Sequence, residues 1–287
     1  MNAGLYAGQS RIKKSREPNM FWQTANFVTQ KALEDGALLP IATEAITIAE
    51  NGVNYLVHTL SANAQSKPIA TPQRSPLDKI PANPFLPYEP ALYVAEAGDH
   101  HVCLLNKFPV LSPHLLICSK TFVPQSALLE RSDFAAWLLG LKSDSSLGFF
   151  NSGPDAGASQ THRHMQLVQT GIPLESVIAS GELPFKHCLY LFETEQDAGY
   201  LYQCYLDAVD RLEMSQHVGK ECEPYNLLLT KRWMLVLPRS RNNIEGVFAN
   251  GFNFTGRFLV KRPEQLAWLT KYGLMNYLKD CVERQEG

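Results

Sequence analysis

The sequence predicts an α+β protein built on an antiparallel sheet, and two observations support that prediction. Strand-forming segments follow one another directly, as over 91–119, and Asn51-Gly52 provides a hairpin turn within 41–60. Apolar residues at helical spacing are confined to a few separate segments, such as 198–216. Because hairpins and meanders outnumber strand–helix–strand patterns, we expect antiparallel pairing with the helices packed outside the sheet.

The expected elements follow one another along the whole chain. They are a helix near 21–36, a hairpin over 41–60, an irregular crossing with seven prolines over 61–90, strands within 91–119, a helix or broken pair over 123–141 with Ser132 or Asp133 as N-cap, a loop and strand over 149–168, a loop and strand over 172–193, a helix over 198–216, a hairpin over 225–240 and a final helix over 263–283.

Composition narrows the class of protein. The 287 residues, 45% apolar and 19% charged, are typical of a globular enzyme made of one large unit or two closely packed halves. A net charge of −2 gives no basic field for nucleic acid, and no apolar run reaches the ~18 residues that a membrane span needs. The six cysteines are scattered without a CxxC pair, and the N-terminus lacks an apolar signal core. We therefore expect a cytoplasmic protein with reduced thiols, no nucleic-acid or membrane partner, and no protein-bound metal or cofactor.

The segment around His162, His164 and Gln166 carries the chemistry. These residues stand two apart among strand-forming neighbours, so their side chains should share one face of a strand, and Arg163 should point to the other face. Glycine and proline within 153–157 allow the backbone to come close to a ligand. The arrangement is typical of a site for attack on a phosphate. A metal site, or two histidines facing a core, remains an alternative from the H-x-H spacing alone, and the histidines at 100, 101 and 114 are expected to be structural or exposed.

The whole string from Asn151 to Gln166, N-S-G-P-x-x-G-x-S-Q-x-H-x-H-x-Q, resembles the histidine-triad (HIT) superfamily. Within it the chain looks most like the transferase branch, the diadenosine tetraphosphate phosphorylases (ATP adenylyltransferases) and the hexose-1-phosphate uridylyltransferases, in which glutamine replaces the third histidine. Further matches are N-P-F at 83–85, N-K-F-P-V at 106–110 and the run over 225–240. The resemblance covers roughly 40–285 and implies a HIT-like fold in a single unit, with 20–190 as the catalytic N-terminal part and 195–287 completing the nucleotide site.

The resemblance also implies a role for each matching residue. His164 corresponds to the nucleophile that becomes adenylylated, with His162 orienting it and Gln166 donating to a phosphoryl oxygen. The residues on substrate-binding positions are Lys67, Asn106, Lys107, Asn151, Gly157, Ala158, Ser159, Gln160, Asn250, Gly251, Phe252, Arg257 and Lys261. For Lys67 an exposed loop lysine is an equal alternative. The chain departs from the family at Ala158, where some members have serine, at Gly251 in place of a small hydroxyl residue, and at Arg257 in place of an apolar one.

Gln166 favours transfer over hydrolysis. An amide can donate to a phosphoryl oxygen but cannot shuttle a proton as imidazole does, so a covalent intermediate should wait for an acceptor other than water. The prediction is phosphorolysis of diadenosine tetraphosphate to ATP and ADP through a His164–AMP intermediate, with a divalent cation such as Mg²⁺ on the polyphosphate. We expect small nucleotides and phosphate as its partners and a monomeric chain. A hexose-1-phosphate uridylyltransferase-like enzyme, a dinucleoside polyphosphate hydrolase and a non-catalytic nucleotide sensor remain alternatives.

Overall fold

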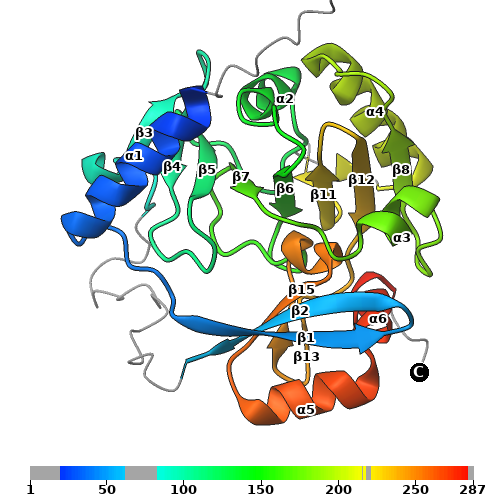
Figure 1. Ribbon diagram of the computed structural model, residues 1–287. Coiled ribbons are helices and arrows are strands. Elements are labelled where there is room, and N and C mark those ends of the chain that lie inside the picture. Colours follow the sequence, from blue (N-terminus) through cyan, green and yellow to red (C-terminus); the bar gives the residue numbers. More distant parts are fainter. Residues whose placement is uncertain (1–19, 62–82, 215, 218–220, 284–287) are drawn as a thin grey trace, which may run out of the picture.

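An eight-stranded antiparallel sheet runs through the centre of the molecule. The computed structural model describes residues 20–61, 83–214, 216–217 and 221–283 (Figure 1). The sheet has the order β3-β4-β5-β7-β6-β11-β12-β8. Its strands are β3 Tyr93–Glu96, β4 His101–Leu105, β5 His114–Ser119, β6 Ser146–Ser152, β7 His164–Gln169, β8 Cys188–Leu191, β11 Tyr225–Leu229 and β12 Trp233–Pro238.

Three helices cover one face of this sheet: α1 (Met20–Glu34), α2 (Arg131–Leu138) and α4 (Ala198–Arg211) (Figure 1). Each presents an apolar stripe, and these stripes bury one side of the strands in a single core. Trp137 of α2 is fully buried there, and its Nε1 donates to the backbone oxygen of Gln166 at 3.0 Å. This helical layer therefore holds β7 from behind.

The opposite face packs against a smaller layer drawn from both ends of the chain. A three-stranded sheet of order β1-β2-β15 lies there with two C-terminal helices (Figure 1). Its elements are β1 Thr43–Glu50, β2 Val53–Leu60, β15 Arg257–Val260, α5 Pro263–Tyr272 and α6 Leu274–Val282. The remaining elements are η1 Pro90–Leu92, α3 Glu175–Ser180, β9 Gln216–His217, β10 Glu221–Cys222, β13 Asn243–Ile244, β14 Val247–Phe248 and η2 Gly251–Thr255.

The predicted α+β class with an antiparallel sheet and external helices is confirmed, while three local expectations need correction. Only 131–138 of the segment 123–141 is helical, and Glu130 is its N-cap, with the Asp133 side chain accepting from the Glu130 amide. The final helix is two helices, because Gly273 has a φ of +96° that breaks the helical path. β15 pairs parallel to β2 because it reaches that sheet after a long excursion rather than through a hairpin.

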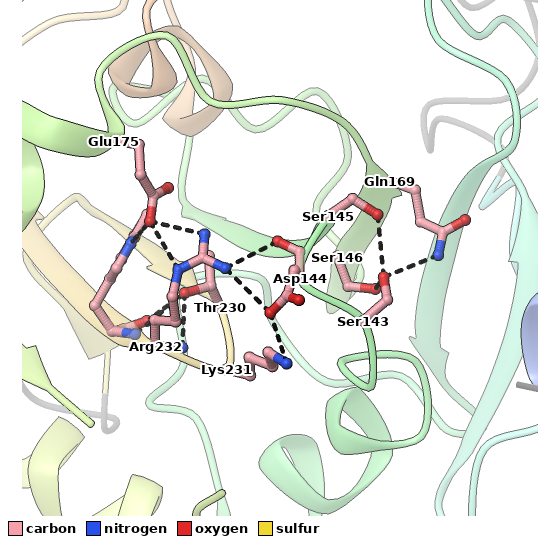
Figure 2. Close-up of polar contacts among 10 residues, drawn as sticks. Ser143, Asp144, Ser145, Ser146, Gln169, Glu175, Thr230, Lys231 and Arg232 are labelled. Atoms are coloured by element: carbon pink, nitrogen blue, oxygen red, sulfur yellow. Dashed lines mark hydrogen bonds and ion pairs between the residues drawn. The ribbon is translucent and has the colours of Figure 1, made fainter. Parts of the chain in front are cut away.

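Strands from both parts of the chain share the two larger sheets, since β11 and β12 lie between β6 and β8, and β15 pairs with β2. Figure 2 shows polar contacts that join the same two stretches away from the histidines. Glu175 Oε1 accepts from Arg232 Nε at 3.0 Å and from Trp233 Nε1 at 2.8 Å, and Lys231 Nζ lies 2.6 Å from Asp144 Oδ1. The turn between β11 and β12 is thereby tied to the segment leading into β6 and to the start of α3.

Within the described residues, no helix combines the length and the apolar character needed to cross a membrane.

Candidate active site

His164 is the first residue of β7, and its buried ring is oriented by one hydrogen bond. Nδ1 lies 2.9 Å from the backbone oxygen of His162. A carbonyl only accepts, so Nδ1 carries the proton and Nε2 keeps a lone pair. In the part of the chain that the structure describes, no group hydrogen-bonds to Nε2. Burial lowers the pKa of His164 to about 4, with the neighbouring His162 adding to the shift. The ring is therefore a neutral nucleophile at physiological pH.

His162 is buried and anchored through both ring nitrogens. Nε2 donates to the backbone oxygen of Ser119 at 2.8 Å, and Nδ1 accepts from Asn83 Nδ2 at 2.7 Å. The expectation that His162 belongs to the same strand as His164 needs correction, because β7 starts only at His164 and His162 makes an isolated bridge to Pro124. Its role in the structure is to fix the carbonyl that orients the His164 ring.

The N-P-F segment at 83–85 packs directly on the two histidines. The Phe85 ring lies 5.6 Å from the His162 ring and 5.3 Å from the His164 ring. Together with the Asn83 contact, this places a segment from far upstream in the sequence at the centre of the site. A phenyl ring over His164 excludes water from one side of the imidazole, which disfavours the charged form and accounts for the direction of its pKa shift.

Gln166 follows on the same strand, and its amide is oriented by His114. The His114 Nε2 lies 2.9 Å from Gln166 Oε1, and His114 Nδ1 lies 3.3 Å from Asn106 Nδ2. Since the Asn106 amide nitrogen can only donate, His114 Nδ1 accepts and Nε2 carries the proton. The oxygen of Gln166 is thus occupied, which leaves its amide nitrogen as the donor for a ligand.

His114 was expected to be structural or exposed, and the structure shows it half-buried and hydrogen-bonded to Gln166. Burial lowers its pKa to about 4, so the ring stays neutral and the tautomer described above is kept. His114 lies just after the N-K-F-P-V stretch, and its contact with Gln166 could not be predicted there because Gln166 is fifty-two residues away. Only the pairing of β5 with β7 brings the two side chains together.

Asn151 is the second-last residue of β6, and its side chain is oriented by contacts with the C-terminal part of the chain. Its Oδ1 accepts from Asn226 Nδ2 at 2.9 Å and from the Gly251 amide at 2.8 Å. A Cβ at Gly251 would lie 2.8 Å from that same oxygen, so the C-terminal segment approaches as closely as a glycine allows. The expected contact between the two parts of the chain is therefore made at Asn151.

The loop after β6 uses two of its four expected amides internally. The Gly157 amide donates to Pro154 and the Ala158 amide to Gly153, which leaves the backbone and side chains of Ser159 and Gln160 as donors for a ligand. Gly157 has a φ of +91°, and a Cβ there would lie 2.7 Å from the backbone of 249–250 and 2.6 Å from the Cβ of Asn250. The loop thus packs against the C-terminal segment through that glycine.

The remaining predicted residues divide into two groups. Asn250 caps η2 by accepting from the Phe252 amide at 2.9 Å, and the Phe252 ring lies 5.4 Å from Phe149, whose ring is 5.9 Å from His114. These residues reach the site. The structure does not bring the following residues into contact with the histidines: Arg257, which bonds the Gly171 oxygen, Lys261, which is exposed, and Lys107, which pairs with Glu89. Lys67 lies outside the described residues.

Two buried residues of the C-terminal part, Arg239 and Asn226, support the loop; both lie in the family-matching run over 225–240, but neither was assigned a role from the sequence. Arg239 is 5% exposed and donates to the backbone oxygens of Ala156 at 3.3 Å and Ala249 at 3.2 Å. It also donates to Asn226 Oδ1, and Asn226 in turn bonds Asn151. Arg239 has no acidic partner at a helical or strand spacing, so periodicity alone does not distinguish it from a surface arginine.

The described residues contain no cluster of three or more His, Cys, Asp or Glu side chains placed to hold a metal ion. The imidazoles of His162 and His164 are engaged with backbone and amide partners instead.

Arg163 points to the opposite face from His164, into a buried charge cluster. Arg163 Nη1 lies 2.9 Å from Asp133 Oδ2, and His101 Nε2 lies 2.7 Å from Asp133 Oδ1.

We expect Asp133→Asn to lower the free energy of unfolding by about 3–5 kcal/mol, because a buried guanidinium loses its counter-charge. Urea titration measures this. The exposed pair of Asp144 with Lys231 supplies the control, since Asp144→Asn should cost at most about 1 kcal/mol. Equal losses for the two variants would contradict the prediction.

The low pKa of His164 predicts an unusual pH dependence. Its protonation should limit attack only as the pH approaches about 4, rather than near the ordinary histidine value of 6.5. Between pH 6.5 and about 4 the unfolded chain binds protons that the folded His164 and His114 exclude, so stability falls as pH is lowered through that window. Rapid-quench measurement of the first turnover and urea titrations at pH 7.5 and 5 test both effects. An acid limb at 6.5 would show that His164 is not shielded.

Comparisons with known proteins agree with this geometry. Residues 11–190 match the family model of the Ap4A phosphorylase N-terminal domain, and residues 181–283 match that of the ATP adenylyltransferase C-terminal domain. Diadenosine 5',5'''-P1,P4-tetraphosphate phosphorylase 2 of Saccharomyces cerevisiae is 30% identical over 241 residues, which are 68% of this chain and 73% of that protein. Protein APA1 of the same yeast is 27% identical over 84% of this chain and 87% of its own length. The crystal structure of yeast Ap4A phosphorylase Apa2 in complex with Ap4A superposes with a TM-score of 0.75 at 25% identity, covering 93% of this chain and 98% of that one.

Proposed function

The chain belongs to the Ap4A phosphorylase family, and on that basis we propose that it converts diadenosine tetraphosphate and orthophosphate into ATP and ADP. The single observation that carries the proposal is the state of the His164 ring. It is buried, it is neutral, and its Nδ1 is held by the His162 carbonyl so that the Nε2 lone pair is free to attack. A relative of known structure binds Ap4A itself.

The first half of the reaction forms a covalent adenylyl intermediate. The Nε2 lone pair of His164 attacks the α-phosphorus of diadenosine tetraphosphate, a P–N bond forms, and the bond to the bridging oxygen breaks. The electron pair of that bond leaves on the terminal phosphate of ATP. The amide nitrogens of Asn151 and Gln166 are the donors left for the phosphoryl oxygens, because the oxygen of each side chain is already engaged. Nδ1 keeps its proton and its hydrogen bond to the His162 carbonyl oxygen, and this oxygen stabilises the positive charge that the ring acquires.

The second half of the reaction returns His164 to its free state. An oxygen of orthophosphate attacks the phosphorus of the His164–AMP intermediate, the P–N bond breaks with its electrons returning to Nε2, and ADP forms. Orthophosphate is an anion at neutral pH and needs no base to remove a proton, whereas water does. Gln166 provides no such base, so the site favours phosphate over water as the acceptor.

The proposed substrate includes a divalent cation such as Mg²⁺, bridging oxygens of the polyphosphate without a protein cage. We also propose that the chain acts as a monomer in the cytoplasm. In support, Asn151 and Gly251 complete the site from the two parts of one chain, and all six cysteines are buried free thiols.

The test is incubation with diadenosine tetraphosphate and Mg²⁺, with and without orthophosphate, followed by chromatographic separation of the nucleotides. We expect ATP and ADP to appear only when orthophosphate is present. ATP with AMP in both tubes would instead show a hydrolase. No product in either tube would exclude the proposed function. UDP-hexose with a hexose 1-phosphate would then test the uridylyltransferase alternative, and calorimetric titration with the tetraphosphate would test a nucleotide sensor.

A further inference from the structure

The strands β6 and β7 stop pairing at the nucleophile. Their last paired residues are Phe149 and Gln166, and continuation of the same register would pair Asn151 with His164. Neither the strand ladder nor any other backbone hydrogen bond joins those two residues. Two neighbouring strands therefore separate at the position where the His164 ring and the Asn151 amide meet the substrate.

The side chain of Gln125 fills the fork between the two strands. Its Oε1 accepts from the His164 backbone amide at 2.8 Å, and its Nε2 donates to the backbone oxygens of Asn151 at 2.8 Å and of His164 at 3.2 Å. The Gln125 side chain thus satisfies three of the four backbone groups that continued pairing of Asn151 with His164 would use. It is 3% exposed, and its own backbone amide donates to Thr161 at 2.8 Å, so the side chain is firmly placed.

A glutamine amide is suited to this position because it accepts through one end and donates through the other. Directly bonded strand residues lie ~5.5 Å apart at Cα, and an inserted amide holds the two backbones further apart than that. The Gln125 amide thereby sets the spacing between the backbones that carry the Asn151 side chain and the His164 ring. It also fixes the His164 backbone without any contact between Gln125 and the reacting nitrogen.

We propose that Gln125 is a positioning residue for nucleotidyl transfer, holding the β6–β7 fork open and His164 in register. The inference rests on the proposed function, since turnover of diadenosine tetraphosphate is the readout. Every assay therefore includes the unmodified protein. If that protein produces no ATP, the proposed function fails; an effect of Gln125 is judged only relative to measured turnover.

Gln125→Glu gives the sharpest test, because its effect depends on protonation. An ionised carboxylate would place negative charge against two carbonyl oxygens, whereas the protonated acid still accepts from the His164 amide and donates to one carbonyl. Burial raises the pKa of such a carboxyl group. We expect kcat to fall about 100-fold at pH 8, the loss that displacing a reacting group by about 1 Å can cause, and to recover as pH is lowered towards 6. KM should change little, because Gln125 lies behind the nucleophile.

Gln125→Met has a similar length but no hydrogen-bonding group, and it should lose kcat at both pH values without recovery. Gln23→Glu, at an exposed position of α1, is the matched control and should leave kcat unchanged. Rates are normalised to the amount of folded protein, measured by circular dichroism and by titration of the sites that form the covalent adduct. Recovery confined to Gln125→Glu supports the proposal. Wild-type kcat in both Gln125 variants overturns it, and so does an equal loss at pH 6 and pH 8 in Gln125→Glu.

Discussion

Replacing His164 with asparagine is expected to lower kcat by roughly 10⁴-fold or more, since loss of a nucleophile has effects of that order or larger in enzymes with covalent intermediates. The side chain loses the Nε2 lone pair, and His114 cannot supply one because its ring nitrogens are engaged by Gln166 and Asn106. His162 cannot substitute, because one of its ring nitrogens donates to Ser119 and the other accepts from Asn83. The measurement is ATP release from diadenosine tetraphosphate and phosphate under saturating conditions.

The covalent step separates this role from a purely structural one. Unmodified protein incubated with diadenosine tetraphosphate in the absence of phosphate should acquire the mass of one AMP, and His164→Asn should not. His100→Asn, at an exposed position, serves as the control and should keep both the adduct and full turnover. Turnover at the wild-type rate in His164→Asn would require the proposed mechanism to be abandoned.

The local pattern of the sequence was enough to predict the central part of this site. Alternation along a strand predicts that His164 and Gln166 share a face, and β7 shows this arrangement, with Met165 and Leu167 buried in the core on the other side. The Asn51-Gly52 hairpin was predicted for the same reason, because a turn and its two strands are consecutive in the chain. Periodicity describes neighbours in sequence, and these features depend only on such neighbours.

Contacts between distant segments were not accessible to that reasoning. His114 contacts Gln166 because β5 pairs with β7, and Arg239 from the C-terminal part donates to Ala156 in the loop after β6. Gln125 lies between two strands to which it does not belong. In each case the chemistry comes from tertiary pairing, and the residue by itself resembles an ordinary polar residue in the sequence. The start of β7 at His164 also required the structure, in which His162 makes only an isolated bridge to Pro124.

Gln166→Glu is expected to reduce kcat by roughly 10³-fold, equivalent to about 4 kcal/mol in the activation barrier. Loss of one preorganised donor alone costs 10²–10³-fold in comparable sites. The substitution also places a carboxylate beside the attacked phosphate. His114 would keep its proton donated to this side chain, so the residue at 166 should stay in the same orientation while its chemistry changes from donor to acceptor. The loss in kcat should therefore reflect the missing amide donor and the added negative charge, rather than a change in the shape of the site.

The same substitution tests why phosphate rather than water is the acceptor. A carboxylate can remove a proton from water and an amide cannot, so the residual turnover of Gln166→Glu should release a larger share of AMP relative to ADP than the unmodified protein does. Gln169→Glu is the matched control, since it lies on the exposed end of β7, where its side chain bonds Ser143, and both kcat and the product ratio should be unchanged. Full activity in Gln166→Glu would show that this amide does not contact the phosphate. A large loss with ADP as the only nucleotide product from the adenylyl group would show that the choice of acceptor is determined elsewhere, and the loop over 157–160 would be the next segment to test.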